Sequence, residues 1–280
     1  MSRGVGLDEL AGARREGRGI LGAVAYDTVG VEAIVTAGRR TGRPIIAQIG
    51  SSAFNHVDAG GLIAAARMII ERSPTPVGLH LDHSGSLEEI RRCLDAGYTS
   101  VMVDGSRLDF ADNVALSTAA VDLARPYAAW VEAELGRIDG DEDRSIAAAG
   151  SGGLTRPSEA ARFVDETGVD ALAVSVGNVH GRTATPVRIH LDLLGELGEA
   201  VRVPLVLHGV SGIDGDTLAV ACRLGVAKFN VNADLRAAYL AAVAEWAGEP
   251  PGDDLVGALR VARQRVTGVL VDLIAVLDPP

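Results

Sequence analysis

The chain alternates short apolar runs with longer amphipathic stretches, and this alternation repeats eight times between residues 20 and 247. The short runs are rich in Val, Ile, Leu and Ala, as in strands buried on both faces, whereas the longer stretches have apolar residues at helical spacing. The predicted strands span residues 20–25, 44–49, 76–82, 100–104, 128–134, 171–176, 204–208 and 227–231. The predicted helices span residues 29–41, 57–72, 87–96, 110–125, 157–167, 191–200, 216–224 and 233–247.

Strict alternation of this kind predicts an α/β fold with parallel strands and right-handed crossovers. Eight βα units in roughly 250 residues are typical of a (β/α)8 barrel, the TIM barrel. A doubly wound open sheet is the alternative, but no GxGxxG segment follows the first strand. One more helix is expected over residues 255–277. We expect residues 1–280 to form one barrel domain, with residues 252–278 as a C-terminal helical extension packed on the barrel or on a neighbouring subunit.

Composition and charge limit the partners of the chain. The net charge of −11 and the lack of a dense Lys/Arg run argue against a nucleic-acid-binding face. The N-terminal residues are polar, and no apolar stretch is long enough to span a bilayer, so we expect a cytoplasmic protein with no membrane partner. The two cysteines, Cys93 and Cys222, do not form a CxxC motif and predict no disulfide framework.

Three of the six histidines follow predicted strands: His83, His180 and His208. Catalytic groups of a barrel collect at the carboxyl ends of its strands, so these three imidazoles should converge on one rim. Three imidazoles with an open fourth position are the ligand set of a catalytic zinc ion. Each histidine alone is equally well explained as a buried, hydrogen-bonded residue, although three facing imidazoles without a metal would be poorly satisfied. We expect the third strand to end at Asp82, leaving His83 just beyond it.

Two loops add to the prediction of a site on this rim. Glycines and a serine follow the sixth and seventh strands and predict a phosphate cradle, with ordinary turn chemistry as the alternative; they are Gly181, Gly209, Ser211 and Gly212. The stretch 136–152 is long for a βα loop and carries Glu142 among other acidic residues. It is interpreted either as a solvated acidic loop or as a lid that closes over a substrate.

Five segments, in matching order, resemble the successive signatures of the class II, zinc-dependent ketose-bisphosphate aldolases, including the fructose- and tagatose-bisphosphate enzymes. The resemblance extends from about residue 21 to about residue 246. The segments are His80-Leu81-Asp82-His83, Val131-Glu132-Ala133-Glu134-Leu135-Gly136, Gly177-Asn178-Val179-His180-Gly181, Leu207-His208-Gly209-Val210-Ser211-Gly212 and Lys228-Phe229-Asn230-Val231-Asn232.

The resemblance implies a lyase that reversibly cleaves a ketose phosphate or bisphosphate through a zinc-stabilised enediolate, releasing dihydroxyacetone phosphate and an aldehyde. It implies one catalytic Zn²⁺ bound by the three rim histidines, with a second divalent or monovalent cation also possible. It further implies a small sugar phosphate as the binding partner, whereas the expectation of a homo-oligomer, a dimer or a tetramer, comes from the last predicted helix.

The resemblance also implies a role for each remaining candidate. Asp82 would handle the proton of the hydroxyl where the carbon chain breaks, and Glu142 the proton on the donor carbon. Asp104 and Glu134 would be alternative or second-site metal ligands. The donor and its phosphate would bind to Gly181, Gly209, Ser211 and Asn230.

Several positions depart from the family pattern around the phosphate. Ala25-Tyr26-Asp27 stands where the family usually has Ala-Phe-Asn, and Ala233 stands where a threonine is common. A Tyr and a Lys often follow the histidine at position 180, but this chain has Arg182-Thr183-Ala184-Thr185. Either Arg182 or Arg188 compensates through its guanidinium, or the donor carries no phosphate.

Three alternatives therefore stay open. The first is an aldolase-like enzyme for a non-standard or unphosphorylated ketose, and the second is a non-catalytic, metal-binding companion subunit. The third is Schiff-base chemistry at Lys228, the only lysine in the chain, in which the three histidines would have no role.

Overall fold

The computed structural model describes residues 4–140, 153–181, 187–248 and 253–278. Eight parallel strands form a closed barrel in the order β1-β10-β9-β7-β5-β4-β3-β2, which confirms the (β/α)8 prediction. The strands are β1 (Ile20–Val24), β2 (Ile45–Gln48), β3 (Val77–Ser84), β4 (Ser100–Val103), β5 (Trp130–Leu135), β7 (Ala171–Val174), β9 (Leu205–Leu207) and β10 (Val226–Val231). Each agrees with its predicted span to within two residues at either end.

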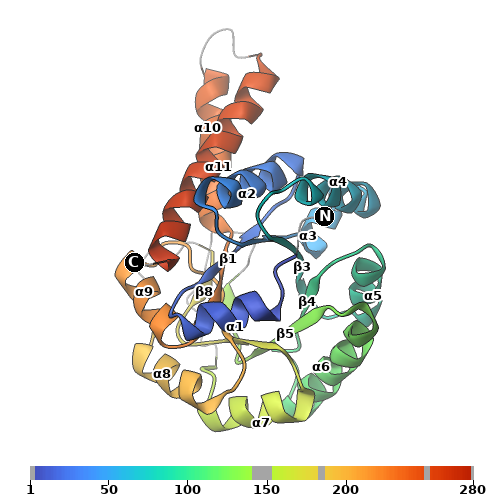
Figure 1. The fold of residues 1–280 in the computed structure, drawn as a ribbon, viewed down its shortest axis with the longest axis vertical. Coiled ribbons are helices and arrows are strands. Elements are labelled where there is room, and N and C mark those ends of the chain that lie inside the picture. Colours follow the sequence, from blue (N-terminus) through green and yellow to red (C-terminus); the bar gives the residue numbers. More distant parts are fainter. Residues whose placement is uncertain (1–3, 141–152, 182–186, 249–252, 279–280) are drawn as a thin grey trace.

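The barrel helices surround the strands (Figure 1). They are α2 (Thr28–Thr41), α4 (Ala59–Glu71), α5 (Leu87–Asp95), α6 (Phe110–Ala124), α7 (Pro157–Thr167), α8 (Leu191–Ala200), α9 (Gly215–Arg223) and α10 (Ala233–Gly248). Several begin at a side chain that accepts a hydrogen bond from the first helical turn, a contact that contributes about 1 kcal/mol per helix. These caps are Asp27, Asp58, Ser86, Asp109 and Asp214.

The barrel contains an element that the alternation did not predict. Helix α1 (Leu7–Arg15) precedes β1 and covers the amino-terminal end of the barrel, where Leu10 and Ala13 pack with apolar interior residues of the strands. The Trp130 indole inside the barrel donates a hydrogen bond to the Val5 carbonyl oxygen at 3.1 Å. With this end closed, the opposite end of the strands is the open one.

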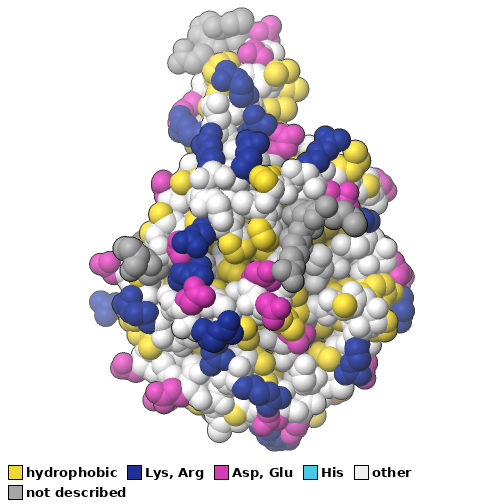
Figure 2. Space-filling view, viewed as in Figure 1, with side chains coloured by type: hydrophobic (Ala, Val, Ile, Leu, Met, Phe, Trp, Pro, Cys, Tyr) yellow, Lys and Arg dark blue, Asp and Glu magenta, His cyan; other side chains and the backbone are white. Residues whose placement is uncertain are grey.

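The C-terminal helix α11 (Leu255–Leu277) contacts α10, α2, α9 and β1. Together α10 and α11 project beyond the barrel as a helical pair (Figure 1). Hydrophobic and basic side chains lie along this pair in Figure 2. Leu240, Leu255 and Val256 are 66%, 68% and 78% exposed, respectively. Among the described helices, none combines the length and the apolarity needed to cross a membrane.

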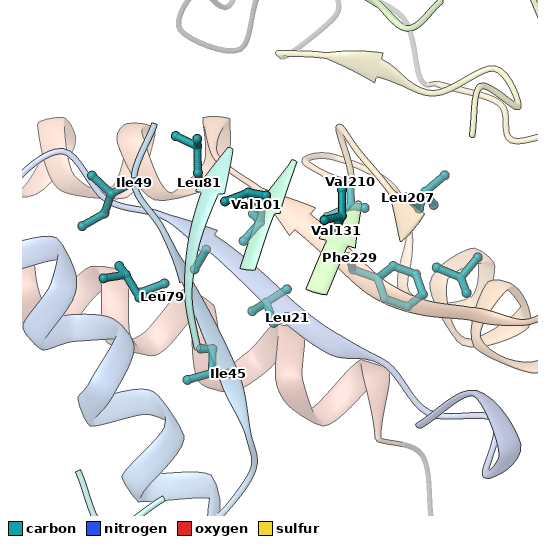
Figure 3. Packing of buried hydrophobic residues seen from close by; sticks show 14 of the residues in the cluster. Leu21, Ile45, Ile49, Leu79, Leu81, Val101, Val131, Leu207, Val210 and Phe229 are labelled. Carbon is teal, nitrogen blue, oxygen red and sulfur yellow. The ribbon is translucent and has the colours of Figure 1, made fainter. Parts of the chain in front are cut away.

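The main core lies between the barrel and its helices (Figure 3). Leu21, Leu79, Leu81, Val101 and Phe229 are among the strand residues in this buried cluster. On each of these strands, the residues that alternate with the core residues face the barrel interior, because successive side chains of a strand point to opposite faces. On β5, Trp130, Glu132 and Glu134 share the interior face, so this face changes from apolar to acidic toward the carboxyl end. Polar groups therefore gather at the open end of the barrel.

Candidate active site

A bulge in β3 places the side chains of two adjacent residues, Asp82 and His83, in the barrel interior. The pairing of β3 with β4 shifts register between Leu81 and Ser84, and His83 has a left-handed backbone with φ of 42°. Neighbouring strand residues normally face opposite sides, but the extra residue of a bulge redirects one of them. A left-handed backbone costs a non-glycine residue about 1 kcal/mol or more. The prediction that the strand ends at Asp82 is therefore wrong: β3 continues to Ser84, and His83 lies within its bulge.

The three rim histidines lie together. His83 Nε2 is 3.0 Å from His208 Nδ1, and one ring nitrogen from each of His83, His180 and His208 lies within 4.8 Å of the other two. The ring planes are edge-on, at 86° for His83–His180 and 74° for the other two pairs. Three imidazole nitrogens this close together fit the ligand set of one divalent cation such as zinc. His180 belongs to β8 (Val179–His180), which pairs with β6 (Asp139–Gly140) in a small sheet that the sequence did not predict.

A pair of carboxylates flanks His83 on the side away from His208. Asp104 Oδ2 is 2.9 Å from His83 Nδ1, and Glu134 Oε2 is 3.9 Å from the same nitrogen. Asp104 Oδ1 accepts hydrogen bonds from both the backbone and the hydroxyl of Ser106, at 3.0 and 2.7 Å. Glu134 Oε2 is buried and has no hydrogen-bond partner among the described residues. His83, Asp104 and Glu134 thus form a second group that fits a cation.

The pKa values of these two carboxyl groups are shifted in opposite directions. Burial raises the pKa of Glu134 to about 8, and the Asp104 carboxylate adds to this effect. Burial would also raise the pKa of Asp104, but its hydrogen bonds with His83 and Ser106 outweigh that and lower it. Without a bound cation, one carboxyl of the pair is therefore ionised at neutral pH and the other is largely protonated.

Asp82 lies beside the histidine cluster and is held from the neighbouring strands. The Gln48 side chain on β2 donates to Asp82 Oδ1 at 2.8 Å, and the Asn230 side chain on β10 approaches the same oxygen at 3.5 Å. Asp82 is buried at 7% exposure, yet it lines the cavity at the mouth of the barrel together with His83 and His180. A carboxylate fixed in this way can accept a proton from a molecule bound in that cavity.

A buried network of hydrogen bonds and an ion pair inside the barrel holds the His208 ring. Glu132 Oε1 is 2.8 Å from His208 Nε2, and Glu132 Oε2 is 2.7 Å from Lys228 Nζ. Burial lowers the pKa of His208 well below its usual value, with His83 and Lys228 as further causes, so its ring is neutral. A neutral ring whose Nε2–H donates to Glu132 presents the lone pair of Nδ1 toward His83. His80 lies in the same network, 3.7 Å from Glu132 Oε2 and stacked on Trp130.

The predicted phosphate-binding residues lie next to the histidines. Gly181 and Gly209 have left-handed backbones, with φ of 84° and 64°. A Cβ at Gly209 would overlap the Val179 carbonyl oxygen, so glycine permits the close approach of the two loops. The Asn230 side chain amide lies 3.0 and 3.2 Å from the two ring nitrogens of His208. Ser211 Oγ accepts from the Asp234 backbone at 3.2 Å.

Two departures from the family pattern have structural explanations. Tyr26, in place of a phenylalanine, uses its hydroxyl to exchange hydrogen bonds with the Asn232 side chain at 2.8 and 3.1 Å. Asp27, in place of an asparagine, caps α2 by accepting from the Gly30 backbone, and it also accepts from the Tyr239 hydroxyl at 2.9 Å. Glu142 and Arg182 lie outside the described residues, and Arg188 is exposed.

The sequence did not assign a role to Gln48 or Glu132, although both lie inside the barrel and contact the site. One signal was present: Glu132 alternates with Glu134 on a strand that is otherwise apolar, so both carboxylates had to share the interior face. Such a carboxylate requires a buried partner. The partners, Lys228 and His208, come from strands far along the chain.

A closed parallel barrel with histidines and carboxylates at the carboxyl ends of its strands is the construction of a barrel enzyme. The class-II fructose-bisphosphate aldolase family matches residues 7–278, and the chain belongs to this family. The YdjI aldolase of Escherichia coli K12 is 28% identical with a TM-score of 0.84, and the match covers 97% of this chain and 95% of that one. A Coccidioides immitis protein assigned as a fructose-1,6-bisphosphate aldolase is 30% identical with a TM-score of 0.89, over 97% and 95% of the two chains.

A more distant neighbour shares the fold alone. The fructose-bisphosphate aldolase of Campylobacter jejuni is 20% identical with a TM-score of 0.82, over 99% of this chain and 96% of that one. The family and the first two neighbours support aldolase activity for this chain, and with it a carbon–carbon lyase.

Proposed function

We propose that the chain is a zinc-dependent aldolase that reversibly cleaves a ketose phosphate or bisphosphate into dihydroxyacetone phosphate and an aldehyde. The observation that carries the proposal is the meeting of three imidazoles around one point beside a buried carboxylate, Asp82. His83, His180 and His208 would hold the cation. When bound there, zinc supplies a Lewis acid that offsets the negative charge developing on the donor's oxygens.

The residues of the chain would carry the proton transfers. Asp82, fixed by Gln48, accepts the proton of the substrate hydroxyl next to the bond that breaks. The hydroxyl oxygen then becomes the aldehyde oxygen, and the electron pair of the carbon–carbon bond stays on the donor carbon. A proton delivered to that carbon completes the cleavage, and we assign this step to Glu142 on the family resemblance.

The donor's phosphate would lie at the loops after β8 and β9, on Gly181, Gly209 and Ser211, with Asn230 at the donor itself. Backbone N–H groups of glycine-rich turns and a hydroxyl are suited to phosphate oxygens. In this structure the Gly212 N–H donates a hydrogen bond to the Asp234 carboxylate at 3.3 Å. The backbone of the loop after β9 therefore already binds one anionic group. A phosphate bound here would lie beside the histidine cluster, because Gly209 directly follows His208.

The test measures the three-carbon products of cleavage. These are triose phosphate from fructose and tagatose 1,6-bisphosphates and from the corresponding 1-phosphates, and dihydroxyacetone with glyceraldehyde from the free ketoses. Activity that a chelator abolishes and zinc restores supports the proposal, and the substrate series distinguishes a phosphorylated donor from an unphosphorylated one. Zinc binding without turnover of any ketose contradicts the proposal and favours a companion subunit.

Variants separate the metal from the proton transfer. His208→Ala should lose both zinc and activity, whereas Asp82→Ala should keep zinc and lose about 10²–10⁴-fold in kcat. His56→Ala is the matched control, because His56 is exposed and should affect neither property. Near-normal cleavage by Asp82→Ala would show that another group accepts the hydroxyl proton.

A further inference from the structure

We propose that Arg107 binds a second anionic group, a phosphate or a carboxylate, on the aldehyde half of the substrate and so selects substrates charged at both ends. The inference rests on the proposed aldol chemistry and extends it to the substrate class. Arg107 lies in the loop that follows β4, and it lines the same cavity as Asp82, His83 and His180.

The charges lining this cavity point to Arg107 as its anion-binding group. The acidic side chains there are Asp82, Asp104 and Glu134, and Arg107 is the only Lys or Arg side chain among the described cavity residues. In the described part of the chain, Arg107 has no hydrogen bond or ion pair, whereas Asp82 and Asp104 each accept hydrogen bonds from the protein. A guanidinium without a protein partner in an otherwise acidic cavity is available to an anionic ligand, which it can bind through two parallel hydrogen bonds.

The barrel order places Arg107 across the mouth from the proposed donor site. In the closed sequence of strands, β4 is four strands from β10 in either direction, so the two are diametrically opposite. Asn230 lies on β10, and the glycine loop with Gly209 follows the adjacent β9. The histidine cluster lies between the two sides, because His83 comes from β3 beside β4 and reaches His208 at the end of β9. A substrate anchored at Gly209 with its carbonyl at the histidines would therefore extend its other end toward the β4 loop.

The β4 loop is fixed, so Arg107 has a defined place in the site. The Leu108 N–H donates to the Gly105 carbonyl oxygen at 2.9 Å, which closes a turn around Ser106 and Arg107. Ser106 binds Asp104 Oδ1, and Asp104 in turn contacts His83 through its other oxygen. The loop is thereby tied to the histidine cluster, while the Arg107 side chain is exposed to the cavity and costs little to replace in stability.

The test measures aldol addition of dihydroxyacetone phosphate to three aldehydes: glyceraldehyde 3-phosphate, neutral glyceraldehyde and the carboxylate-bearing succinic semialdehyde. In Arg107→Gln, kcat/KM for the preferred anionic aldehyde should fall about tenfold or more, mainly through KM, because a charged hydrogen-bond partner is lost. The kcat/KM for neutral glyceraldehyde should fall far less. The ratio of the two kcat/KM values, which measures the discrimination between anionic and neutral aldehydes, should therefore decrease. Arg107→Lys should retain part of it, and the wild-type preference tells phosphate from carboxylate.

Arg40→Gln is the control for the change in net charge. Arg40 is also exposed, but it lies in the last turn of α2, at the opposite end of the barrel from the cavity. This variant should leave all three aldehydes unaffected. Equal loss for all three aldehydes in Arg107→Gln, or loss for none, overturns the assignment of Arg107. If the wild-type protein adds the donor to none of them, the proposed function fails, and the assignment fails with it.

Discussion

Lys228 Nζ lies 2.7 Å from Glu132 Oε2 at the centre of the barrel, and both side chains are fully buried. Lys228 is the only lysine in a chain whose other basic side chains are arginines and histidines. A buried ion pair loses most of the solvation of both charges, so additional hydrogen bonds are needed to offset that loss. One such contact joins Glu132 Oε1 to His208 Nε2 and connects the ion pair to the proposed metal ligand, and another joins Lys228 Nζ to His80 Nε2 at 3.5 Å.

Glu132→Gln should weaken zinc binding by about 10–100-fold, because the group that orients a metal-ligating imidazole contributes about that much to affinity. An amide at this position can donate to His208 Nε2 and favour the tautomer in which Nδ1 carries the proton. The measurement is competition for zinc with a chromogenic chelator. Glu196→Gln, at an exposed position on α8, is the control and should bind zinc normally.

The single substitution leaves Lys228 without its counter-charge, so a double variant is needed beside it. Glu132→Gln with Lys228→Met removes both charges together and avoids an isolated buried ammonium. It should fold and still bind zinc more weakly than the wild type. Wild-type affinity in the folded double variant would show that the network does not position His208.

Lys228 should not form a Schiff base. Its Nζ is bonded to Glu132, its side chain is fully buried, and it is absent from the residues that line the cavity. Borohydride reduction in the presence of dihydroxyacetone phosphate should therefore add no mass to the protein, as judged by intact mass spectrometry and peptide mapping. A reduced adduct on the peptide that contains Lys228 would instead support the lysine mechanism that the sequence left open.

The sequence predicted the barrel because alternation is a local property that each βα unit displays separately. It also indicated the rim positions of His83, His180 and His208, since the carboxyl end of each strand could be located to within two residues. The bulge at His83 could not be predicted, because it depends on how β3 pairs with β4.

Two further features were missed, each for its own reason. The contact between Glu132 and His208 joins residues that are 76 positions apart, and no spacing in the sequence indicates it. Helix α1 was missed because only Leu10 and Ala13 of its residues are buried, which is too few for a clear helical pattern. The Glu132–His208 contact thus depends on distant parts of the chain, whereas α1 has too weak a local pattern to be predicted.

Glu134 should make the metal-free protein less stable as the pH rises. A glutamate carboxyl in water has a pKa of about 4.5, and burial raises the pKa of Glu134 to about 8 in the folded chain. Between these values the folded state keeps a proton that the unfolded state releases, so the free energy of unfolding should fall as the pH is raised across this range. Glu134→Gln carries a permanently neutral group and should lack this contribution.

The measurement is urea denaturation of chelator-treated wild type and Glu134→Gln at about pH 5.5 and about pH 8, which lie within and at the upper end of that range. Other titrating groups are common to both proteins, so the difference between the two isolates Glu134. The wild type should lose more stability than the variant over this range, by more than about 1 kcal/mol. Parallel pH profiles would mean that the Glu134 carboxyl is not protonated in the folded, metal-free chain.

Gly209→Ala should cost more stability and more zinc affinity than Gly212→Ala, although both glycines have left-handed backbones, with φ of 64° and 79°. An added Cβ at Gly212 meets no atom within 4 Å, so that variant reports only the backbone cost, about 1 kcal/mol. At Gly209 the Cβ would overlap the Val179 carbonyl, which forces apart the loops that carry His208 and His180. Urea denaturation and chelator competition measure the two effects. Equal losses in both variants would mean that the loops can separate without disturbing the histidine cluster, and that their close approach does not hold the cluster together.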